Sequence, residues 1–124
     1  MEFLYYGAAI LLVAIAAAHS YLGERFILSR LFTRTNLPKL LGSDDFTKRT
    51  LRFAWHITSV AWLGFAAIIV CMSHPGAENL SVIHIIAATF AVHFLISLLG
   101  SGGKHLSWIV FGLISVLLWF AVLL

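Results

Sequence analysis

Charged residues are scarce in this chain: they make up 10% of its 124 residues, against roughly a quarter in soluble domains. The single cysteine, Cys71, can form neither an intramolecular disulfide nor a CxxC redox pair. None of the five acidic residues falls in the middle of a long apolar run, so proton-coupled transport through a buried carboxylate lacks its central residue. A histidine relay is the transport mechanism that stays open.

Long apolar runs dominate the chain, which is 61% hydrophobic with a mean hydropathy of +1.00. A bilayer-spanning helix needs about 20 such residues, and short connections force consecutive spans to be antiparallel. We therefore predict an all-α integral membrane protein: a four-transmembrane-helix antiparallel bundle that contacts the lipid bilayer and forms one domain, residues 1–124. The expected spans are residues 3–22, 53–73, 80–99 and 105–124.

Positive charge is concentrated in the first connection, residues 23–52, and the eighth basic residue, Lys104, lies in the third. By the positive-inside rule, this linker is cytoplasmic and both termini lie outside. Nucleic-acid binding is not expected, because the basic residues flank an apolar run and are interspersed with Phe and Leu. A helix should begin near Asp44 and continue into the second span. The seven basic residues of the linker are Arg25, Arg30, Arg34, Lys39, Lys48, Arg49 and Arg52.

One histidine in each apolar run lies toward the predicted cytoplasmic side: His19, His56, His93 and His105. At 1.5 Å per residue their expected depths are about 6, 6, 10 and 2 Å. Ionisable residues in membrane spans usually face other protein segments, so the similar depths predict a shared site. Small and hydroxyl residues share the helical faces of these histidines, which is compatible with a pocket or with ordinary helix packing.

One hypothesis is a b-type haem held by two histidines on facing helices. The depth-matched pairs are His19 with His93 and His56 with His93, and Arg49 and Arg52 would meet the propionates. The protein would then be a membrane redox or electron-transfer protein with a redox partner or a quinone. It could act alone, as a homo-oligomer or within a larger complex.

Two other hypotheses stay open for the same histidines. A bare zinc, copper or iron ion could be bound by His19, His56 and His93, with His105 or Glu24 as a fourth ligand. No HxxxH or ExxH pair occurs within one predicted helix, so only the matching depths support a metal site. Alternatively, the histidines form hydrogen bonds between helices, and the protein is a structural or accessory subunit without a cofactor.

The middle of the chain, Gly42-Ser43-Asp44-Asp45-Phe46 through Thr50-Leu51-Arg52-Phe53-Ala54-Trp55-His56, resembles a family of small bacterial inner-membrane proteins with four spans. The resemblance implies a multi-pass protein of the bacterial inner membrane. It carries no catalytic motif and implies no activity.

Overall fold

The computed structural model describes residues 2–76 and 79–123, and within these ranges the chain contains helices, turns and no strand. The two chain ends at Met1 and Leu124 lie outside the described residues, as do Ala77 and Glu78 of the second connection. The chain ends, which the positive-inside rule places outside, therefore lie partly outside the residues that the structure describes. The elements are α1 (Glu2–Leu22), the π-helix η1 (Gly23–Leu28), α2 (Ser29–Leu31), α3 (Asp45–Met72), α4 (Asn79–Ser101) and α5 (Ser107–Leu123).

Three helical stretches are long and apolar enough to cross a membrane: Phe3–Leu31, Asp45–Met72 and Asn79–Ser101. The first continues past the predicted span through η1 and α2, and α3 begins at Asp45, as the residues around Asp44 predict. The fourth apolar run forms the shorter helix α5, which begins two residues after His105. His105 therefore lies in the preceding turn and not in a helix, which corrects the sequence prediction.

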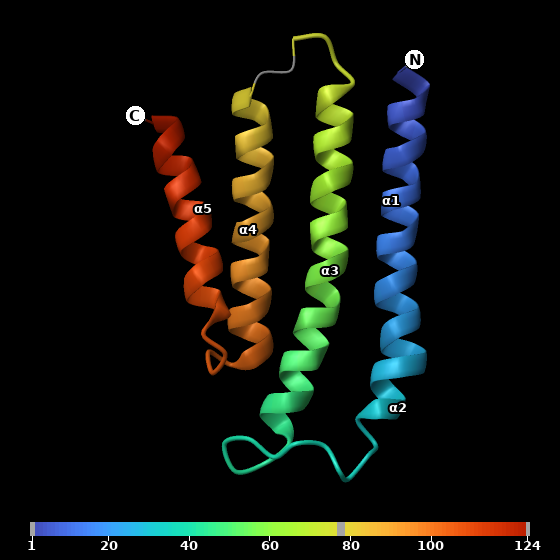
Figure 1. Ribbon diagram of the computed structural model, residues 1–124, viewed down its shortest axis with the longest axis vertical. Coiled ribbons are helices and arrows are strands. Elements are labelled where there is room, and N and C mark those ends of the chain that lie inside the picture. The colour runs from blue at the N-terminus through green and yellow to red at the C-terminus, as the bar shows by residue number, and fades with distance from the viewer. Residues whose placement is uncertain (1, 77–78, 124) are drawn as a thin grey trace.

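The long helices form a single row in the order α1, α3, α4, α5 (Figure 1). They alternate in direction, and the described ends of α1 and α5 lie at the same end of the molecule. Among the described residues α1 packs on α3, α3 also packs on α4, and α4 packs on α5, whereas α1 contacts neither α4 nor α5. Each long helix therefore packs only on the long helix before or after it in the described chain, and the predicted four-transmembrane-helix antiparallel bundle is not confirmed.

Small side chains allow the helices of the row to approach closely. Between α3 and α4, a Cβ atom at Gly64 would overlap Thr89, and one at Gly100 would overlap Phe53. Between α4 and α5, the Ser115 hydroxyl donates a 2.8 Å hydrogen bond to the carbonyl of Ala87. In a membrane such close packing and interhelical hydrogen bonds replace the hydrophobic effect as the source of helix association.

Candidate functional site

A polar network joins α1 and η1 to α3 at the linker end of the row. The Nδ1 atom of His56 lies 2.9 Å from Ser20 Oγ, and its Nε2 atom lies 3.1 Å from Glu24 Oε2. Arg52 also binds this carboxylate, with Nη2 2.9 Å from Oε1 and Nε 3.3 Å from Oε2. The Ser20 hydroxyl is hydrogen-bonded to Ser59 Oγ at 2.8 Å. Both ring nitrogens of His56 are therefore engaged between helices.

The spacing of polar residues along α3 and along the first helical stretch brings the members of this network together. Arg52, His56 and Ser59 recur at three- and four-residue intervals, which places them on one face of α3. Ser20 and Glu24 are likewise four residues apart, but Glu24 lies in the π-helical turn η1. A π-turn accommodates an extra residue within the helix and frequently occurs at functional sites. Because the α3 face meets α1, His56 pairs with the first helix and not with α4.

His19 occupies an aromatic environment beside this network. Its ring stacks on Trp55 with 4.6 Å between centroids and meets Trp62 edge-on at 5.0 Å. The Trp55 indole N–H donates a 2.9 Å hydrogen bond to the His19 carbonyl. Gly23 lies directly against the same indole, so that a Cβ atom there would overlap it. The buried Nε2 atom of His19 has no hydrogen-bond partner among the described residues.

His93 is 5% exposed and lies on α4 between Phe90 and the Phe111 ring of α5. Its Nδ1 atom is 2.7 Å from the carbonyl of Thr89, a contact within its own helix. The neighbouring hydroxyl of Ser97 also bonds back to its own helix. A cavity of about 120 Å³ lies beside His93 between α3 and α4, and neither His19 nor His56 lines it. The described side-chain hydrogen bonds of Thr89, His93 and Ser97 are therefore all made within α4.

His105 lies in the turn that leads into α5. Its Nδ1 atom accepts a 3.3 Å hydrogen bond from the Ser107 backbone N–H and lies 2.9 Å from the Ser107 hydroxyl. Its ring packs against Phe46 and Phe53 of α3, with centroid distances of 5.9 and 5.3 Å. The contacts of His105 thus belong to the start of a helix and to an aromatic cluster.

The predicted ligands are consequently divided among separate contacts. Among residues 2–76 and 79–123, no three His, Cys, Asp or Glu side chains are grouped as a metal site would require. Haem and bare-metal binding stay predictions. Arg49, Arg52 and His56 line one cavity of about 400 Å³ between α3 and α4.

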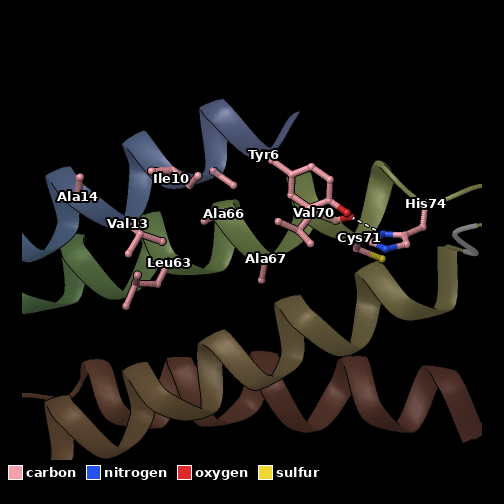
Figure 2. Close-up of a pocket in the computed structure, with 11 residues that line it drawn as sticks. Tyr6, Ile10, Val13, Ala14, Leu63, Ala66, Ala67, Val70, Cys71 and His74 are labelled. Carbon is pink, nitrogen blue, oxygen red and sulfur yellow. Dashed lines mark hydrogen bonds between the residues drawn. The ribbon is translucent and has the colours of Figure 1, made fainter. Parts of the chain in front are cut away.

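A larger, almost entirely apolar cavity of about 800 Å³ lies between α1 and α3, toward the end of the row that is opposite the linker (Figure 2). Figure 2 shows Tyr6 and His74 at one end of it and Ala14 and Leu63 at the other. His74 is exposed, and its Nδ1 atom lies 2.9 Å from the Val70 carbonyl. This geometry supplies few polar groups with which to orient a ligand.

The sequence did not identify Ser20 or Trp55 as parts of the site, and it suggested Glu24 only as an additional metal ligand. The four-residue spacing of Ser20 and Glu24 was the available signal, because it matches the Arg52–His56 spacing on α3.

Comparisons with family models, with curated proteins and with solved structures found no match to this chain.

Proposed function

We propose that this chain is a small structural or accessory subunit of a membrane assembly, in which histidines hold helices together. The observation that supports this most strongly is that both ring nitrogens of His56 are engaged, one with Ser20 and the other with Glu24. An imidazole binds a metal through a nitrogen lone pair, so His56 would have to release one of these contacts to become a ligand. Helix pairing is the role that this geometry favours.

The open row supports the same proposal. The described helices form a single row in which α1 contacts neither α4 nor α5, and large apolar side chains lie exposed along the helices. Extended apolar surface of this kind is typical of contact with lipid or with other membrane segments. An accessory subunit would use part of it for lipid and part for its partners. The exposed set includes Phe3, Ile10, Leu11, Phe65, Leu95, Leu99, Leu113, Leu117 and Phe120.

The test is purification at native abundance in a mild detergent, with the mass of the assembly, the absorption spectrum and the metal content recorded together. We expect an assembly of defined stoichiometry that is heavier than one 13.7 kDa chain and shows no Soret band. His56→Ala should loosen this assembly without changing its metal content. A monomer that carries one haem or one metal ion per chain would contradict the proposal.

Haem binding is the second candidate, and one observation favours it. Arg49, Arg52 and His56 line one cavity, an arrangement that would bring two guanidinium groups near the propionates of a haem bound by His56. This candidate requires that His56 exchange one of its present contacts for the iron. Changing Arg49 and Arg52 together to Gln should then weaken haem retention or shift the midpoint potential. Binding of a bare cation should be unchanged or slightly stronger, because nearby arginines repel it.

A further inference from the structure

The cavity of about 400 Å³ between α3 and α4 combines a basic wall with an apolar wall at the linker end of the row. Its volume lies within the range of roughly 300–1,000 Å³ that small-molecule sites occupy. Arg49, Arg52 and His56 lie on one face of α3, because they are three and four residues apart. The lining residues are Arg49, Arg52, Phe53 and His56 from α3 and Ile96 and Gly100 from α4.

The charges at this end are not balanced within the chain. All eight Lys and Arg residues of the chain lie at this end, seven within residues 23–53 and the eighth at Lys104. Only three of the five acidic residues lie there. Two of these acids are already engaged, since Glu24 binds Arg52 and His56, and Asp44 forms an ion pair with Lys48 at 2.9 Å. Within the described chain, Arg49 forms no ion pair with a carboxylate.

Arg49 is therefore the cation of this cavity that is most accessible to an external anion. Arg52 contributes part of its charge, but the Glu24 carboxylate already occupies its Nη2 and Nε atoms. Guanidinium groups bind phosphate oxygens with planar, bidentate geometry. The opposite wall, formed by Ile96 and Gly100 with Phe53 at its side, offers an apolar surface that a free inorganic ion would not use.

We propose that this cavity binds the phosphate of an anionic phospholipid through Arg49, with an acyl chain lying against the apolar wall formed by Phe53, Ile96 and Gly100. Basic pockets between membrane helices are a recurring mode of lipid headgroup recognition. The mixed lining favours a lipid over free phosphate, although the two share the same phosphate chemistry. The inference goes beyond the proposed accessory role, because a subunit with or without partners could hold such a lipid.

The experiment is native mass spectrometry of the complete protein in detergent, with phosphatidylglycerol or phosphatidylcholine added at equal concentration. Arg49→Gln removes the accessible charge but leaves the Glu24–Arg52 pair intact. Arg30→Gln is the matched control, since it removes an equal charge from the same end but lies outside the cavity. Thermal unfolding without added lipid checks that both variants are folded.

We expect phosphatidylglycerol to bind in preference to phosphatidylcholine, and Arg49→Gln to weaken that binding by about tenfold, the scale of one charge-assisted hydrogen bond. Arg30→Gln should bind like the unmodified chain. Equal binding of the two lipids, or equal weakening by both variants, would overturn the site. Inorganic phosphate that displaces the lipid at comparable concentration would overturn the assignment to a lipid and assign the cavity to the free ion.

Discussion

Replacing His56 with Ala provides the most direct test of the polar network. The change removes the 2.9 Å contact with Ser20 and the 3.1 Å contact with Glu24, while Ser20 keeps Ser59 and Glu24 keeps Arg52. Hydrogen bonds between membrane helices contribute about 0.6 kcal/mol each on average and up to about 1.7 kcal/mol. We therefore expect the free energy of unfolding to fall by about 1–2 kcal/mol.

A double-mutant cycle isolates the contact between His56 and the carboxylate. Glu24 is 39% exposed at its side chain and Arg52 is 49% exposed, so solvent screening reduces the value of this ion pair to about 0.2–1 kcal/mol. The His56–Glu24 contact involves a charged acceptor, and we expect His56→Ala and Glu24→Gln to show a coupling energy of about 1 kcal/mol.

The coupling energy between His56 and Glu24 is measured by SDS unfolding in mixed micelles, followed by tryptophan fluorescence. Tryptophan reports on this region because Trp55 and Trp62 lie at the α1–α3 interface beside His19. His84→Ala is the control: this histidine is exposed, and its change should shift stability by less than about 0.5 kcal/mol. A coupling energy below about 0.3 kcal/mol, the error of additivity, would refute the network as a source of helix pairing.

Three further predictions concern packing, orientation and the deepest histidine. Gly23→Ala places a methyl group against the Trp55 indole and should destabilise the protein by about 1–3 kcal/mol, whereas Gly7→Ala meets open space and should be nearly neutral in thermal unfolding. A cysteine at Lys39 should be protected from an impermeant thiol reagent in intact cells and labelled after permeabilisation; labelling in intact cells would reverse the predicted orientation. His93→Ala should remove any haem or metal that purifies with the protein, and full retention would contradict a ligand role for His93.

The sequence was sufficient to predict the helices because its apolar runs are long and their connections contain Gly, Pro or charge. The helix start near Asp44 followed from a capping sequence, whereas the first helical stretch continues to Leu31, past the predicted span end at residue 22. The start of α5 was placed too early, because His105 and Leu106 continue the apolar run but belong to the turn. Hydropathy alone does not distinguish a helix from an apolar turn that precedes it.

The sequence assigned the site histidines a depth but not a direction. Counting residues from the helix ends put His19 and His56 at the same level, and in the structure both contact residues across the α1–α3 interface. The rotation of each helix about its axis depends on which neighbours it packs against, and hydropathy does not identify those neighbours. In the described row α1 contacts α3 but neither α4 nor α5. His93 packs against Phe90 of its own helix and Phe111 of α5, whereas its depth had suggested His19 or His56 as its partner.

The π-turn at Gly23–Leu28 has a consequence for how this helix tolerates change. Leu28 is only 2% exposed, and it lies four residues beyond Glu24, which itself lies four beyond Ser20. In an uninterrupted α-helix each residue turns the chain by about 100°, so a one-residue deletion in the middle of α1 would rotate everything downstream by roughly that angle. A π-turn accommodates an extra residue locally, so a one-residue deletion within Gly23–Leu28 would leave a regular α-helix in which the following residues keep their face. The helix should therefore tolerate a deletion at this turn better than one in α1.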